Sequence, residues 1–187
     1  MVDSFRSGLF ALWLLLAPAG VRSDEAVPAI EDRQVHVERS RHGFSVDLQM
    51  HAPVSPSLAW AVLTDFDHMA AFVPNLKSSR IVEHGENTLK VNQSGTARYG
   101  IVTIDFESVR DIRLIPEREI RSHGVGGNFK HMESTMHLEP EADGTRLQYH
   151  ADVEPEFWLP PLIGPAAVRH ETAEQFSAIL QEMVRRR

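Results

Sequence analysis

Four polar side chains are candidates for contact with a small molecule, because each falls on an otherwise apolar face. Arg169 lies near the centre of an apolar helical stripe, where a guanidinium can hold a ligand carboxylate, phenolate or carbonyl through two parallel hydrogen bonds. It can equally pair with an inward-facing acid, or lie along the core wall with its charged head in water. A buried guanidinium is costly without a partner, so we expect Arg169 to have one.

Gln93, Tyr149 and His170 are the other three candidates. Gln93 alternates in phase with apolar residues, so its amide points inward, either toward a ligand or into a structural hydrogen bond. Tyr149 places a phenol on the inward face of a later strand. His170 borders the helical stripe, where an imidazole acts as an acid or base or forms the rim of a pocket. We predict ligand contact for these residues and assign no catalytic residue, because catalysis needs a positioned acid–base pair.

The histidines of the sheet invite a metal interpretation, which their spacing does not support. His131 and His137 share one face of a strand, and parity places Met132 and Met136 on the other, apolar face. The sequence contains no HExxH motif and no cysteine, which excludes thiol catalysis and cysteine-ligated metals. We therefore expect neither a metal nor a cofactor.

Apolar residues are expected to line the same ligand space. Methionines suit irregular apolar walls, and a tryptophan followed by two prolines is expected to shape the entrance before the final helix. The predicted apolar contacts are Met132, Met136, Phe106, Phe72 and Trp158.

The last stretch of the chain, 157–187, must position Arg169 and His170. It follows a helical period with one broad apolar stripe, and a helix of this length needs a large concave surface to cover that stripe. The stripe comprises Leu162, Ala166, Ala173, Phe176, Ile179, Leu180, Met183 and Val184. The opposite, polar side comprises Glu171, Glu174, Gln175, Glu182 and Arg185.

The rest of the chain supplies that surface as strands. A strand near 44–50 precedes two short helices, which begin at Ser55-Pro56 and run to about Phe72. Period-two alternation then predicts strands at 77–83, 88–99, 101–109, 118–123, 129–138 and 145–153, with a turn or bulge at 124–127. Hairpin connections make the sheet antiparallel, and one apolar face per strand means one covered face. The fold class is α+β, with about six or seven strands covered by the long C-terminal helix.

The N-terminus predicts export. Arg6, an apolar run and Ala17-Pro18-Ala19 follow the order of a cleavable signal peptide, although an uncleaved anchor is the alternative. We expect a signal peptide at 1–23, a flexible lead-in at 24–33 and one domain at 34–187, located in the periplasm or secreted and not stably inserted in the membrane. The formal net charge of −7 disfavours nucleic acid as a partner.

Several segments together resemble the START-like (SRPBCC, helix-grip) superfamily, in its polyketide cyclase/dehydrase and coenzyme-Q-binding branch. The likeness extends over roughly 35–187, including the terminal helix, and is carried by Ala52-Pro53, Trp60 to Phe66, Met69, Phe72 to Leu76, Gly127 to Lys130, Leu138 to Pro140 and Gly144-Thr145. The resemblance implies a curved sheet that grips the C-terminal helix, with an elongated cavity between them for an apolar or aromatic molecule.

Three functional hypotheses follow. The first is a domain that binds or carries a hydrophobic small molecule, such as a lipid, a quinone-like or an aromatic compound. The second is a cyclase or dehydratase acting on a polyketide-like or aromatic substrate. The third is an interaction module without ligand, whose cavity would be filled by its own side chains.

Overall fold

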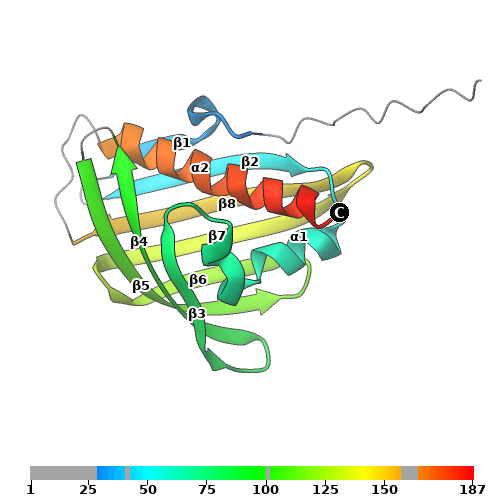
Figure 1. Ribbon diagram of the computed structural model, residues 1–187, viewed down its shortest axis with the longest axis horizontal. Helices are drawn as coiled ribbons and strands as arrows, with labels where there is room; N and C mark the ends of the chain where they lie inside the picture. The colour runs from blue at the N-terminus through cyan, green and yellow to red at the C-terminus, as the bar shows by residue number, and fades with distance from the viewer. Residues whose placement is uncertain (1–28, 41–42, 100–101, 157–163) are drawn as a thin grey trace, which may run out of the picture.

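A computed structural model describes residues 29–40, 43–99, 102–156 and 164–187, so the expected signal peptide lies outside the described residues. One antiparallel sheet of eight strands is covered on one face by a long C-terminal helix, α2 (Figure 1). The strands are β1 (His36–Arg39), β2 (Phe44–Ala52), β3 (Leu76–His84), β4 (Thr88–Tyr99), β5 (Val102–Ile115), β6 (Glu119–Gly127), β7 (Phe129–Glu141) and β8 (Gly144–Pro155). The helices are η1 (Asp32–Gln34), α1 (Pro56–Leu63), η2 (Phe66–Ala71) and α2 (Gly164–Arg185). The predicted α+β architecture is confirmed, with slightly more strands than expected.

The strand order brings an early strand and the last strand together. The order β1-β2-β8-β7-β6-β5-β4-β3 pairs the early strand β2 with the last strand β8, and the remaining neighbours are consecutive hairpins. The strand β2 alternates between buried residues and more exposed ones along its length, from Phe44 to Ala52. The buried set faces α2, which lies across the sheet (Figure 1).

The segment 124–127 is a bulge within a strand, so the alternative of a turn is wrong. Gly126 lies opposite Val109 and Gly124 opposite Arg110, which leaves one extra residue in β6. Gly127 has a φ of +103°, and a Cβ there would meet the carbonyl oxygen of Glu107 at 2.1 Å, so glycine is required. Beyond the bulge, β5 continues to Ile115 rather than ending at 109.

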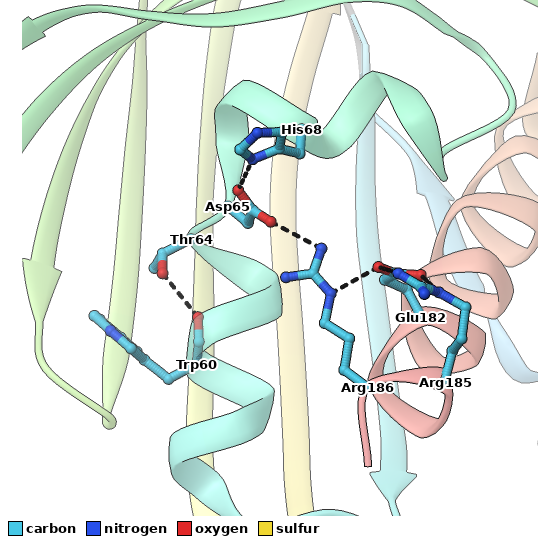
Figure 2. Close-up of polar contacts among 7 residues, drawn as sticks. All are labelled: Trp60, Thr64, Asp65, His68, Glu182, Arg185 and Arg186. Atoms are coloured by element: carbon cyan, nitrogen blue, oxygen red, sulfur yellow. Dashed lines mark hydrogen bonds and ion pairs between the residues drawn. The ribbon is translucent and has the colours of Figure 1, made fainter.

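The first helix forms as its sequence predicts. Ser55 is the N-cap, its side chain accepts a hydrogen bond from the backbone N–H of Leu58 at 3.3 Å, and Pro56 occupies the first turn. Thr64 closes the helix by donating to the carbonyl oxygen of Trp60 at 2.8 Å (Figure 2).

The C-terminal half of α2 is held by a group of charged residues that we call the C-terminal anchor: Asp65, Glu182, Arg185 and Arg186. Figure 2 shows Arg186 between the two acids, with Nη2 2.8 Å from Asp65 Oδ2 and Nε 2.6 Å from Glu182 Oε1. Arg185 binds the same Glu182 carboxylate at 2.6 Å. These hydrogen bonds lower the pKa of Glu182 to about 2. The anchor ties the end of α2 to the junction of α1 and η2.

The beginning of the described chain also contacts α2. The backbone N–H of Ile30 donates to Ser177 Oγ at 2.8 Å, and η1 begins at Asp32, within the stretch 24–33 that was expected to be a flexible lead-in. None of the helices in the described ranges is both long enough and apolar enough to cross a bilayer.

Candidate functional site

A cavity of about 330 Å³ lies between the inner face of the sheet and the N-terminal half of α2. Most of its lining is apolar and comes from β2, β4 to β8, α1, η2 and α2. Its volume is at the lower end of the range of roughly 300–1,000 Å³ that is usual for small-molecule pockets.

The residues of α2 explain why this space stays open. The helix faces the cavity with Ala167, Val168 and Thr172 in its first half, whereas its second half buries Leu180 and Met183 completely. Small side chains do not reach the sheet, so the first half leaves a gap that the second half fills. The helix therefore has a cavity half and a packing half.

A row of polar side chains crosses the apolar wall of the cavity. We call it the polar band: Gln93, Arg110, Ser122, Ser134 and Tyr149. Strand register brings these residues together, because Ser122 pairs directly with Ser134 across β6 and β7, while Arg110 is the diagonal neighbour of Ser122 across β5 and β6. The band thus joins side chains from five strands on one surface.

Arg110 carries the positive charge of the band. Its Nη2 donates to Gln93 Oε1, and no carboxylate in the described part of the chain lies within ion-pairing distance of it. Its Nε is buried without an acceptor, and the accessible surface that the side chain keeps is at the cavity wall. Burial lowers the pKa of Arg110, although a guanidinium stays protonated in proteins. In the described residues Arg110 is therefore a cation without a carboxylate within ion-pairing distance, although Glu171 of α2 lines the same cavity.

Tyr149 is a neutral hydrogen-bond donor beside this cation. Burial raises the pKa of its phenol, and the positive charge of Arg110 together with a hydrogen bond to Ser134 opposes part of that rise. Its ring packs against Phe176 of α2, with centroids 4.7 Å apart and planes tilted by 58°. The ring is thus fixed by the helix while the hydroxyl stays in the polar band.

Gln93 combines the two roles that its sequence position left open. It lines the cavity and is itself buried, and its Nε2 donates to Ser79 Oγ at 2.9 Å and lies 3.4 Å from Met69 Sδ. With its amide nitrogen held in this way, its oxygen is directed to Arg110. Gln93 therefore positions the guanidinium.

Glu171 joins α2 to the other side of the cavity. Its carboxylate accepts hydrogen bonds from Asn75 Nδ2 and from the backbone N–H of Arg98, the latter at 2.6 Å. Burial is the main cause that raises its pKa, and the hydrogen bond from Arg98 opposes it. Glu171 thus clamps the cavity half of α2 to β4.

Most of the predicted apolar stripe of α2 is buried, but the predicted polar side is wrong at three positions. Glu171 and Gln175 were expected on the polar side, yet both line the cavity, and Glu182 from the same side is buried. The face toward the cavity mixes apolar residues with Ala167, Glu171, Thr172 and Gln175, and a search for an apolar stripe does not select small and polar residues of this kind.

The orientation of α2 places Arg169 and His170 away from the cavity lining, contrary to the prediction. Arg169 is half-buried at the edge of the helix face. His170 turns toward η1, with Nδ1 3.3 Å from Asp32 Oδ1 and Nε2 3.5 Å from Glu174 Oε1. A rotation of one residue, about 100° on a helix, is enough to move a side chain off the facing surface.

Some of the other predicted contact residues line the cavity and some do not. The residues that the structure places in the cavity wall are Gln93, Tyr149, Met132, Met136 and Phe106. Phe72 is not among the described lining residues, because its ring packs under the guanidinium of Arg186, with Cζ 5.6 Å from the ring centroid. Trp158 lies outside the described residues.

The polar residues of the cavity lining that the sequence reading missed include Arg110, Ser122, Ser134 and Glu171. Arg110 was lost because the strand was expected to end at 109, one residue too early. The alternation of side chains along the strand could have identified Arg110, because it lies an even number of residues from Phe106, which was predicted to face inward.

One group of possible metal ligands occurs in the described residues, formed by His51, Glu141 and Asp143 on the outer surface. His51 Nδ1 lies 2.8 Å from Glu141 Oε2, and Arg146 Nε donates to Glu141 Oε1 at 2.7 Å. Because an arginine and a histidine already share this carboxylate, the group is a set of surface ion pairs.

Comparison with known proteins agrees with this architecture. A family model described as polyketide cyclase / dehydrase and lipid transport matches residues 52–175. No curated protein sequence matches the chain significantly.

Solved structures share the fold at low sequence identity. A START superfamily protein from Mycobacterium smegmatis is 15% identical with a TM-score of 0.66, over 76% of this chain and 99% of that one. The STAR-related lipid transfer protein from Xanthomonas axonopodis is 13% identical with a TM-score of 0.65, over 80% and 92%. The Zhui aromatase/cyclase from Streptomyces sp. R1128 is 18% identical with a TM-score of 0.63, over 81% and 96%. These likenesses show a START-like fold.

Proposed function

The chain belongs to the polyketide cyclase/dehydrase and lipid transport family, and from this premise we propose that it binds or carries a hydrophobic small molecule in the cavity between the sheet and α2. The observation that carries the proposal is the apolar cavity of about 330 Å³ in a domain of ordinary composition. An apolar ligand that fills such a space gains the transfer free energy and the dispersion contacts that an empty wall lacks.

The open volume favours ligand binding over a ligand-free interaction module. That hypothesis expects a cavity filled by the protein's own side chains, yet Ala167 and Thr172 face the space from α2 and Ala151 faces it from the sheet. A protein selected only for stability would carry larger residues there, because cavities of this kind cost free energy.

The experiment is the recovery of a bound hydrophobe. The protein is purified from its native compartment, and native mass spectrometry before and after solvent extraction detects a co-purifying molecule. Thermal unfolding with a panel of fatty acids, alcohols, quinones and aromatic compounds then tests binding directly. If no molecule co-purifies and no compound of the panel raises the midpoint, the proposal fails.

A cavity-filling substitution supplies the matched control. Ala167→Phe places a ring in the space and is expected to abolish binding, since Ala167 lines the cavity. Ala61→Phe makes the same change on an exposed helical position of α1 and is expected to leave binding unchanged. Equal binding by the two variants would locate the ligand elsewhere.

A cyclase or dehydratase is the second candidate, and one observation favours it. The neutral phenol of Tyr149 and the carboxyl of Glu171, whose pKa burial raises, both line the cavity, so a donor and an acceptor of protons face one space. The test is incubation with polyketide-like β-keto substrates, with loss of water or ring closure followed by mass spectrometry. Turnover that Tyr149→Phe abolishes would favour the enzyme over the carrier.

We also propose that the mature domain is exported, because the first residues have the pattern of a signal peptide and the chain has no cysteine. Cell fractionation and N-terminal sequencing of the mature protein test this. Recovery in the cytoplasm with an intact N-terminus would contradict it.

A further inference from the structure

The charge of Arg110 is the feature that a purely apolar ligand does not explain. A guanidinium presents five N–H donors, and in the described residues Arg110 uses Nη2 for Gln93 while Nε has no acceptor. A buried cation needs a counter-charge or several acceptors, since transfer from water is costly otherwise. The sheet that surrounds Arg110 contributes an amide, a phenol and serines to the cavity, and none of these carries a negative charge at neutral pH. The carboxylate in the described lining, Glu171 of α2, instead accepts hydrogen bonds from Asn75 and from the backbone N–H of Arg98.

The neighbours of Arg110 include hydroxyl groups that can donate hydrogen bonds. The hydroxyl of Tyr149 is close enough for the guanidinium charge to affect its ionisation, and Ser122 Oγ is buried without a hydrogen-bond partner. The one strong acceptor of the band, Gln93 Oε1, is already used by Arg110. A group that complements this surface must therefore accept hydrogen bonds and carry negative charge.

The neighbour of Arg110 on β6 is a glycine. Gly124 pairs with Arg110, and Met132 fills the space that a side chain there would need, because a Cβ at this position would meet Met132 Cβ at 2.9 Å. The rest of the wall is apolar, including Met132, Met136 and Phe106. The cavity thus combines one cationic, donor-rich location with an extended apolar surface.

We propose that the ligand is an amphipathic monocarboxylic acid, whose carboxylate pairs with the Arg110 guanidinium and accepts a hydrogen bond from Tyr149, while its apolar part fills the cavity toward α2. This inference rests on the proposed function and specifies the chemical class of its ligand. A carboxylate matches the planar fork of arginine with two hydrogen bonds, a neutral alcohol offers one acceptor without charge, and an amine is repelled. Gln93 is a positioning residue, because its hydrogen bond orients the guanidinium of Arg110.

The test compares two probes that differ only at the polar end. Dodecanoic acid and dodecanol are titrated by calorimetry at neutral pH into the solvent-extracted full chain. The variants are Arg110→Met, which keeps the length of the side chain without charge, and Arg110→Lys, which keeps the charge without the fork. Arg113→Met is the matched control, because Arg113 lies on the same strand and is exposed on the opposite face.

We expect the wild type to distinguish the acid from the alcohol and Arg110→Met to lose this preference. The wild type binds the acid at least about tenfold more tightly than the alcohol, and Arg110→Met weakens acid binding by about tenfold to a hundredfold while alcohol binding is unchanged. Arg110→Lys gives an intermediate loss, and Arg113→Met behaves as wild type. Tyr149→Phe, which removes one hydroxyl from a retained ring, weakens acid binding several-fold and serves if Arg110→Met does not fold.

Two contrary results distinguish a failure of the carboxylic-acid inference from a failure of the proposed binding function. If the acid and the alcohol bind equally and Arg110→Met changes neither, the inference is wrong, the guanidinium is satisfied without ligand, and the binding function stands. If neither probe nor any other hydrophobe binds the wild type, the proposed function fails as well.

Discussion

Two partly buried arginines of this protein have opposite surroundings. Arg186, at the end of α2, lies between the carboxylates of Asp65 and Glu182 and over the ring of Phe72. Arg110, in the cavity, has the amide of Gln93 and the phenol of Tyr149 nearby, and no acid within ion-pairing distance among the described residues. The difference separates a charge that stabilises the fold from one that remains available to a ligand.

The glutamates of α2 show the same contrast. Glu182 in the C-terminal anchor is surrounded by two guanidinium groups, which lower its pKa to about 2. Glu171 at the cavity has neutral donors, and burial raises its pKa. In the packed half of α2 the glutamate is therefore stabilised by opposite charges, whereas in the half that faces the cavity burial disfavours the charged glutamate. Such a division is expected where a residue that serves binding is not optimal for stability.

The largest expected effect comes from breaking the anchor. Arg186→Met leaves Asp65 without its arginine and weakens the environment of the buried Glu182, so we expect the free energy of unfolding to fall by about 3 kcal/mol. The control is Arg185→Met, because that side chain is 70% exposed and binds Glu182 alone among the described residues, so we expect a clearly smaller loss. Urea unfolding of both variants measures the difference, and equal losses would show that burial of Arg186 is unimportant.

The second effect is on acid stability. A carboxyl with a lowered pKa in the folded state contributes stability above its unfolded value of 4.5, and this contribution is lost as the pH falls toward about 2. Glu182→Gln is expected to be less stable than wild type at pH 7 and to lose less stability between pH 4.5 and pH 2, by on the order of 1–2 kcal/mol. Unfolding followed across this range tests the prediction, with the exposed Glu174→Gln of the same helix as control. Parallel curves for wild type and Glu182→Gln would contradict it.

The third variant is expected to raise the free energy of unfolding, whereas the first lowers it. Arg110→Met removes a buried cation without a counter-charge, so in ligand-free protein we expect the free energy of unfolding to rise by about 1 kcal/mol. The same denaturant experiment measures it beside Arg186→Met. A loss of stability as large as that of Arg186→Met would mean that Arg110 is a structural residue, and the contrast between the two arginines would disappear.

The smallest effect concerns Glu171. Burial raises the pKa of Glu171 in the folded state, so the charged form of its carboxyl is disfavoured there. The folded wild type therefore becomes more stable as the pH falls from neutral through the folded pKa toward the unfolded value of 4.5. Glu171→Gln is expected to lack this gain, with a change of about 0.5 kcal/mol or less at pH 7, because the amide oxygen still accepts a hydrogen bond. Thermal unfolding between pH 7 and pH 4.5 provides the measurement. If the variant gains stability with falling pH as wild type does, another group is responsible.

The sequence by itself determined the architecture and the inward face of most strands. Strand parity is strict, since side chains alternate every residue, so Gln93, Tyr149, Met132, Met136 and Phe106 were placed correctly on the cavity wall. The start of α1 at the Ser55 cap was an equally local property.

The tertiary structure alone decided the phase of α2 and the partners of its charges. Hydrophobic periodicity assumes that the buried face is the apolar face, and this fails where a helix covers a cavity, because Glu171, Thr172 and Gln175 face the open space there. The phase error selected Arg169 in place of Arg110.

Charge pairing was also beyond the sequence pattern. Asp65 and Arg186 are more than a hundred residues apart along the chain and meet only after the sheet has closed on α2. Whether an arginine finds an acid depends on such long-range contacts, which residue types and spacing do not encode. For this reason the sequence singled out Arg169, and only the fold showed that Arg110 lines the cavity without a carboxylate within ion-pairing distance in the described residues.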